Sequence, residues 1–251
     1  MEKIRLEICC GSADDVIEAW HAGADRAELN SNLFQGGLTP SLGELLCVKE
    51  ETTLPVMTMV RPRAGGFLYT DMEYKTALLD ARELLNHGSD GLVFGFLNAD
   101  GTVDEERTRR LTVMAKEAGK QAVFHRAIDV TPDWKRALDT LISLGVDRVL
   151  TSGQEPDVFF ALDTIAQMIR FAGNAIEILP GAGVTLKNAA RVAEATGARQ
   201  LHLARHRRLS DPSTTNNRDI YYGGALYPPE DTFEMTDGAY VAAVRECLNG
   251  R

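Results

Sequence analysis

Short apolar runs alternate with longer amphipathic stretches along the whole of this chain. The short runs have the length and composition of buried strands, and there are eight of them. They lie at Leu6–Cys9, Ala27–Leu29, Val56–Val60, Leu92–Phe96, Ala122–Phe124, Val149–Leu150, Ile176–Leu179 and Leu201–Leu203. Helical spacing between them is clearest at Asp71–His87, Glu105–Ala118, Pro132–Leu144, Val158–Phe171 and Thr185–Ala195. Asp71 and Thr131-Pro132 fit helix starts, so the pattern predicts strands and helices in alternation.

A short repeat supports this order of elements. Gly23-Ala24-Asp25-Arg26 is echoed by Gly145-Val146-Asp147-Arg148, and weaker copies begin at Gly88 and Gly197. Each copy places a helix-ending glycine directly before an even-numbered strand. This even spacing within 251 residues predicts a closed (β/α)8 TIM barrel, a single domain over residues 1–251. A doubly wound open sheet is the alternative, but it needs no eightfold repeat and usually has fewer strands.

Composition narrows the class of function. The formal charge of −9 disfavours binding to nucleic acid, whose phosphates a net-negative surface repels. No apolar run approaches the roughly 18 residues that span a bilayer, so no membrane association is expected. The first residues lack a signal-peptide core and the four cysteines are too few for a disulfide framework, which together predict a cytoplasmic protein. Residues 206–236 are expected to form a long irregular segment near the C-terminus.

Polar residues gather where the predicted strands end, which is where barrels of this kind carry their chemistry. Because side chains alternate along a strand, Leu6 and Ile8 should face the helices, and Glu7 and Cys9 the barrel interior. Cys10 should then point away from Cys9, so the two cannot clamp one metal ion. The remaining candidates at the strand ends are Glu28, Asn30, Arg61, Arg63, His125, Arg126, Asp129, Thr151, Ser152, Gly181, Gly183, His202 and Arg205.

These residue types support an enzyme that acts on a small anionic or phosphorylated metabolite. The acid/base candidates, for isomerase or lyase chemistry, are Glu7, Glu28, His125 and Asp129. The substrate-binding candidates are Arg61, Arg63, Thr151, Ser152, Gly181, Gly183, His202 and Arg205. The two glycines of this set would cradle a phosphate with backbone N–H groups, and the arginines would grip an anion. Alternatively, Glu7 and Glu28 are buried structural carboxylates paired with Arg61 or Arg126, or Glu28 holds a divalent metal with His125 and His202.

Seven motifs in order along the chain give a family resemblance. They are Leu6-Glu7-Ile8-Cys9, Gly23-Ala24-Asp25-Arg26, Gly36-Gly37-Leu38-Thr39-Pro40-Ser41, Arg61-Pro62-Arg63, Phe124-His125-Arg126-Ala127, Arg148-Val149-Leu150-Thr151-Ser152-Gly153 and Gly181-Ala182-Gly183. Over about residues 5 to 205 the chain resembles the CutC copper-homeostasis family. The resemblance implies a cytosolic TIM barrel, a homo-oligomer, and binding of Cu(I) through cysteines.

The chain departs from that family at one position relevant to copper. Family members often carry a cysteine directly after the Glu-Leu of the second strand, where this chain has Asn30. Cu(I) prefers soft thiolate ligands, and Cys9 is then the one thiol expected at the barrel mouth. His125 or His202 could replace the missing thiolate.

Overall fold

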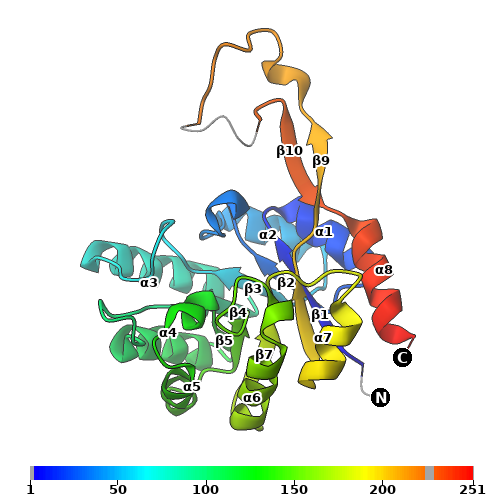
Figure 1. Ribbon diagram of the computed structural model, residues 1–251. Helices are drawn as coiled ribbons and strands as arrows, with labels where there is room; N and C mark the ends of the chain where they lie inside the picture. The colour runs from blue at the N-terminus through cyan, green and yellow to red at the C-terminus, as the bar shows by residue number, and fades with distance from the viewer. Residues whose placement is uncertain (1–2, 224–228, 251) are drawn as a thin grey trace.

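Eight parallel strands form the centre of the computed structural model, which describes residues 3–223 and 229–250 (Figure 1). The strands are β1 (Arg5–Cys10), β2 (Arg26–Leu29), β3 (Val56–Met59), β4 (Gly91–Phe94), β5 (Gln121–Phe124), β6 (Arg148–Thr151), β7 (Glu177–Pro180) and β8 (Gln200–Leu203). They are hydrogen-bonded in the order β7-β6-β5-β4-β3-β2-β1-β8. At the seam between β7 and β8, the Gln200 side chain donates to the Ile178 carbonyl at 3.4 Å. The predicted (β/α)8 barrel is confirmed.

The helices surround the strands and cover their apolar outward faces (Figure 1). They are α1 (Ala13–His21), α2 (Leu42–Glu51), α3 (Asp71–Asn86), α4 (Glu105–Glu117), α5 (Trp134–Ser143), α6 (Leu162–Ala172), α7 (Ala189–Thr196) and α8 (Gly238–Asn249). Leu6 and Ile8 are fully buried in this layer, as their alternation on β1 predicts. The predicted helix start at Thr131-Pro132 is wrong, because the Asp133 carboxylate caps α5 by accepting from two backbone N–H groups.

The repeat seen in the sequence corresponds to a repeated structural contact. Asp25 precedes β2, and its carboxylate accepts from the backbone N–H of Leu6 on β1 at 2.8 Å. Asp90 and Asp147 make the same contact to the start of the preceding strand, at 3.0 and 2.7 Å. Each aspartate therefore joins the bottom of an odd-numbered strand to that of the next even-numbered strand. The copy at Gly197 has Arg199 in place of the aspartate.

The barrel interior is divided into a charged part and an apolar part. Met57, Met59, Val93 and Val123 on β3, β4 and β5 form a small buried apolar cluster. The interior positions of β1, β2, β6 and β8 instead carry charged or amide side chains, including the fully buried Arg148. Because unpaired buried charges are costly, these strands must provide partners for one another.

Residues 206–236 form an arm between β8 and α8, a departure from the irregular segment that the sequence predicts (Figure 1). Its base is an antiparallel ribbon of β9 (His206–Ser210) and β10 (Thr232–Thr236), with a short 3₁₀ turn at Pro212–Thr214 beyond it. Residues 224–228 of the predicted segment lie outside the described part of the chain. The buried Asp15 carboxylate on α1 accepts from the Thr236 backbone N–H at 2.6 Å and so ties the ribbon to the barrel.

Throughout residues 3–223 and 229–250, none of the helices combines the length and the apolar character needed to cross a membrane.

Candidate functional site

A cavity of about 900 Å³ opens at the C-terminal ends of the strands and under the base of the arm. Among the residues predicted to be catalytic, substrate-binding or metal-binding, five line it: Cys9, Glu28, Arg61, His125 and His202. The strand-end candidates Asn30 and Arg126 line it as well. The arm adds His206, Thr232, Phe233 and Glu234 to the lining. No local sequence signal pointed to these arm residues, because they reach the mouth only through the ribbon's attachment to α1.

Three of the five form one cluster in the cavity. The ligand atoms of Cys9, Glu28 and His202 all lie within 4.8 Å of one another. The register places Cys9 beside Glu28 on neighbouring strands β1 and β2, and β8 brings His202 in from the other side of β1. The Cys9 thiol donates to Glu28 Oε2 at 3.7 Å, and His202 Nε2 lies 3.9 Å from the same oxygen. A thiol, an imidazole and a carboxylate therefore converge at one point.

Asn30 completes this cluster. Its amide Nδ2 donates to Glu28 Oε2 at 3.0 Å and lies 3.7 Å from the Cys9 sulfur. Position 30 is thus in direct contact with Cys9. The Cys10 thiol points the other way and donates to the Ile8 carbonyl at 3.5 Å, as strand alternation predicts.

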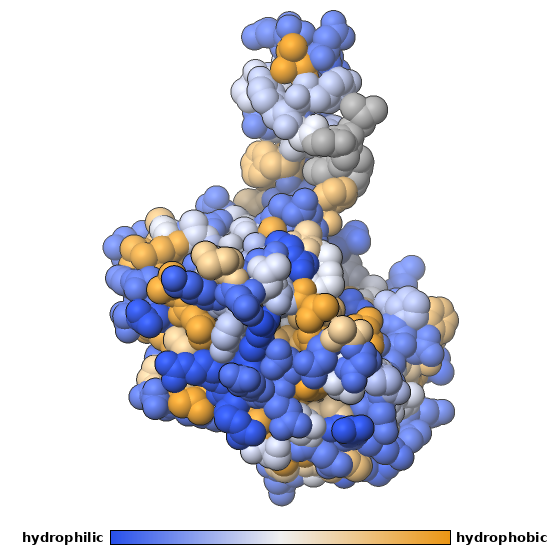
Figure 2. Space-filling model, turned by 90° about the vertical axis from the view of Figure 1, so that its left-hand side faces the viewer, coloured by the Kyte–Doolittle hydropathy of each residue, from blue (hydrophilic) through white to orange (hydrophobic). Residues whose placement is uncertain are grey.

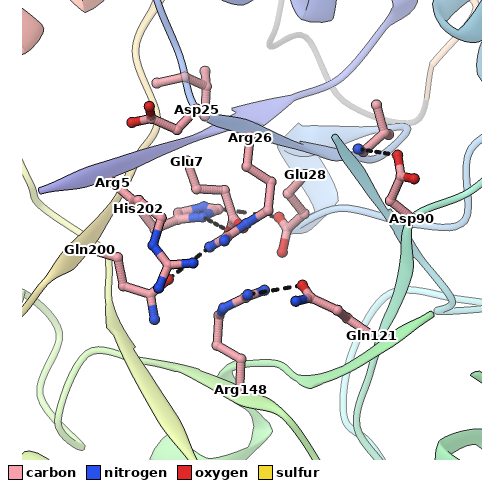
Figure 3. A network of polar contacts seen from close by, with 12 residues as sticks. Arg5, Glu7, Asp25, Arg26, Glu28, Asp90, Gln121, Arg148, Gln200 and His202 are labelled. Carbon is pink, nitrogen blue, oxygen red and sulfur yellow. Dashed lines mark hydrogen bonds and ion pairs between the residues drawn. The ribbon is translucent and has the colours of Figure 1, made fainter. Parts of the chain in front are cut away.

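A chain of ion pairs supports the cluster from the barrel interior (Figure 3). Glu7 accepts from His202 Nδ1 at 2.8 Å and also pairs with Arg26, whose guanidinium donates to Gln200 at 3.0 Å. Arg148 forms a second such group with Gln121 and Glu177, both at 2.9 Å. The expectation that Arg61 or Arg126 pairs with Glu7 is wrong. The partner is Arg26, which belongs to the repeat and lies beside Glu7 in the β1–β2 register.

Burial and charge shift the protonation of this group strongly. Burial raises the pKa of the Cys9 thiol to about 11, even though its hydrogen bond with His202 acts in the opposite direction. Burial also raises the pKa of Glu28. Burial alone would lower the pKa of His202, but the Glu28 carboxylate and the bonds to Cys9 and Glu7 raise it well above its usual value. Burial alone would raise the pKa of Glu7, but the charge of Arg26, the bond to His202 and the charge of Arg148 together hold it well below its usual range.

Arg61 and His125 form another wall of the cavity, with Phe67 between them. The Arg61 guanidinium lies 5.5 Å from the centre of the Phe67 ring, and the His125 ring lies 4.9 Å from it. Gly95 leaves room for the imidazole, because a Cβ there would stand 2.4 Å from His125 Cε1. Burial and the Arg61 charge lower the pKa of His125 to about 3, so this histidine is neutral at physiological pH.

Asp129, Thr151 and Ser152 form a separate hydrogen-bonded group that does not line the cavity. The Asp129 carboxylate accepts from the Thr151 hydroxyl at 2.5 Å, from the Ser152 N–H and hydroxyl, both at 2.9 Å, and from Arg126 Nε at 2.9 Å. With its oxygens bonded in this way, Asp129 fixes the loops after β5 and β6.

The other predicted anion-binding residues also lie outside the cavity lining. Arg63 pairs with Glu73 at 2.5 Å, and Arg205 stacks on the Tyr240 ring at 5.0 Å. At Gly183 a Cβ would stand 2.0 Å from a carboxylate oxygen of Asp157, so a negative charge already packs against this loop. Gly181 packs against Leu150 and His202. These contacts do not favour a phosphate at the strand-7 glycines.

Comparison with known proteins agrees with the resemblance found in the sequence. The family model described as the CutC family matches residues 4–207. A Treponema denticola protein named family protein CutC is 57% identical over 235 residues, which cover 94% of this chain and 95% of that protein. The human copper homeostasis protein cutC homolog is 38% identical over 232 residues, covering 92% of this chain and 84% of its own. A Streptococcus agalactiae crystal structure named CutC aligns with a TM-score of 0.75 at 33% identity, covering 79% of this chain and 97% of that one.

Proposed function

Because this chain belongs to the CutC family, we propose that it serves copper homeostasis in the cytoplasm by binding Cu(I) as its cargo. The convergence of Cys9, Glu28 and His202 within 4.8 Å is the observation that carries this proposal. Cys9 and Cys10 are free thiols, and a reducing compartment would keep them in that form.

The donor set fits Cu(I) through two of its three groups. Thiolate and imidazole are ligands that suit copper, whereas the harder carboxylate of Glu28 contributes mainly charge. His202 is already oriented for this role, because Glu7 holds its Nδ1 and leaves Nε2 on the side of Glu28, 3.9 Å from Oε2. A carboxylate bonded to the far nitrogen of a metal-binding histidine is a recurring support of metal sites.

Copper binding at this cluster must release protons. Cys9 is a thiol at neutral pH because its pKa is about 11, and the raised pKa of His202 keeps its imidazole protonated. Both groups bind a metal only after losing a proton. The affinity for Cu(I) should therefore rise with pH, and Asn30, which supplies no second thiolate, limits it further.

An anaerobic titration of Cu(I) against a chromophoric chelator tests the proposal. We expect one tightly bound copper per chain, and a loss of about 100-fold in affinity for Cys9→Ser, in which the single thiolate of the cluster is gone. Cys47→Ser is the matched control, since Cys47 is exposed on α2. Asn30→Cys should bind more tightly than the wild type. Equal affinity in Cys9→Ser and the wild type would overturn the proposal.

We further infer that the chain forms a homo-oligomer through its arm. The arm stands clear of the barrel in two perpendicular views (Figures 1 and 2). It exposes large side chains, with Tyr222 80% and Tyr221 56% accessible and Ile220 and Phe233 about half so. Aromatic side chains exposed on a projecting arm are typical of a contact surface for another protein chain.

A further inference from the structure

Five polar side-chain atoms of the cavity residues are buried without a hydrogen-bond partner. Nε2 of His206 lies 4.0 Å from an Asp15 carboxylate oxygen, and Oδ1 of Asn30 belongs to an amide whose Nδ2 already donates to Glu28. The other three atoms are Nε of Arg61, Nε2 of His125 and Oε1 of Glu28. Each of these side chains is at least 94% buried, with exposed fractions of 6%, 4% and 3%. Buried polar groups are nearly always paired, and each exception calls for a partner. That all three residues line the same cavity indicates a ligand that pairs with them.

Two of these atoms are donors. The His125 Nδ1 accepts from the Ala127 backbone N–H at 3.1 Å, so the neutral ring carries its proton on Nε2. Arg61 uses its terminal nitrogens on the carbonyls of Gln35, Gly37 and Gly65, at 2.8 to 3.0 Å, which leaves its Nε–H free. Within residues 3–223 and 229–250, no carboxylate forms an ion pair with Arg61. A buried guanidinium bonded only to neutral carbonyls keeps an unbalanced positive charge. The partner that best balances it is a negatively charged oxygen.

The third atom is an acceptor on the wall formed by β1, β2 and β8. Glu28 Oε2 is occupied by Asn30 and Cys9, whereas Oε1 has no partner. A carboxylate oxygen pairs with an N–H or O–H donor. A ligand that satisfies these atoms therefore needs an anionic oxygen near Arg61 and His125. It also needs a hydrogen-bond donor near Glu28.

The space between the walls suits an organic molecule more than a bare ion. The cavity volume is about 900 Å³, and Met59, Phe67 and Leu150 provide apolar lining between the polar groups. We infer that the cavity binds a small organic carboxylate that also carries an amino or hydroxyl group. The carboxylate lies at Arg61 and His125, and the second group lies at Glu28. This site is distinct from the copper proposal, since two of its three anchors are not copper ligands.

Binding to metal-free protein tests this inference separately from copper. The probes are the common amino acids and small 2-hydroxy carboxylates such as lactate and malate, screened by thermal shift and measured by calorimetry after chelator treatment. At least one should raise the melting temperature. Its amide, which lacks the carboxylate charge, and its analogue without the amino or hydroxyl group should each bind about tenfold more weakly or worse.

Variants then locate the binding site. His125→Phe and Arg61→Lys should each weaken the best probe about tenfold or more. His87→Phe, directly after α3, and Arg107→Lys, on α4, should not. Arg61 also holds loop carbonyls, so if its variant fails to fold, His125→Phe decides the question. The inference is overturned if no probe stabilises the protein, if the amide binds as well as the acid, or if His125→Phe binds like the wild type. None of these results bears on the Cu(I) titration.

Discussion

His125 shows how one side chain can link stability to pH. Its imidazole is buried and neutral, and its pKa falls to about 3 from an ordinary value near 6.5. Between these two values the unfolded chain binds a proton that the native chain does not. The contribution of His125 to the free energy of unfolding should therefore be fully present above about pH 6.5. It should be lost progressively as the pH falls towards 3.

Replacing this residue should flatten the acid side of the stability profile. For His125→Phe we expect the loss of unfolding free energy between about pH 6.5 and 4 to be smaller than in the wild type by on the order of 2–3 kcal/mol. Urea unfolding at a series of pH values measures it. His87→Phe, at an exposed position after α3, should keep the wild-type slope. An unchanged slope in His125→Phe would show that the ring is protonated in the native protein.

At the scale of secondary-structure elements, ion pairs and hydrogen bonds between buried side chains link the inner faces of β1, β2 and β8. Arg26 on β2 pairs with Glu7 on β1 and with Gln200 on β8, and Glu7 in turn holds His202 (Figure 3). The side chains of Arg26 and Glu7 are 7% and 3% exposed. A buried pair of this kind contributes little compared with apolar packing, but losing one partner leaves an uncompensated buried charge.

Arg26→Met should therefore be strongly destabilising. We expect a loss of about 3–5 kcal/mol, because Glu7 would stay buried opposite an apolar side chain. Arg5→Met removes a partner of Glu177 from a pair with side chains 49% and 39% exposed, and should cost about 1 kcal/mol or less. Denaturant unfolding of both variants compares them directly. Equal costs would mean that water or rearrangement solvates Glu7 after the substitution.

At the scale of the whole molecule, the arm of residues 206–236 projects from the barrel (Figure 1), and we expect the barrel to fold without its outer part. Ser210 on β9 lies directly opposite Thr232 on β10, so a two-residue Asn-Gly turn can join them in place of residues 211–231. The shortened chain keeps the Asp15 contact that anchors the ribbon.

Shortening the arm should separate association from folding. We expect the wild type to sediment as an oligomer, and the shortened chain as a monomer whose melting temperature differs by only a few degrees. Analytical ultracentrifugation and thermal unfolding give the two readouts. The double substitution of Tyr221 and Tyr222 by serine tests the same surface with the loop length unchanged. A monomeric wild type, or a shortened chain that still associates, would contradict the role assigned to the arm.

Alternating apolar runs and the glycine-aspartate repeat were enough to predict the barrel, because strand alternation and helix termination depend on neighbours in the chain. The same local rule placed Glu7 and Cys9 inside and Cys10 outside. The pairing of the buried charged side chains, in contrast, depends on how the strands come together when the barrel closes. β8 brings His202 against β1 across 195 positions of sequence, and Glu7 has Arg26 as its partner rather than the expected Arg61. The arm shows the same limit. Its ribbon forms where Asp15 of α1 holds Thr236, a contact between residues 221 positions apart that no local pattern encodes.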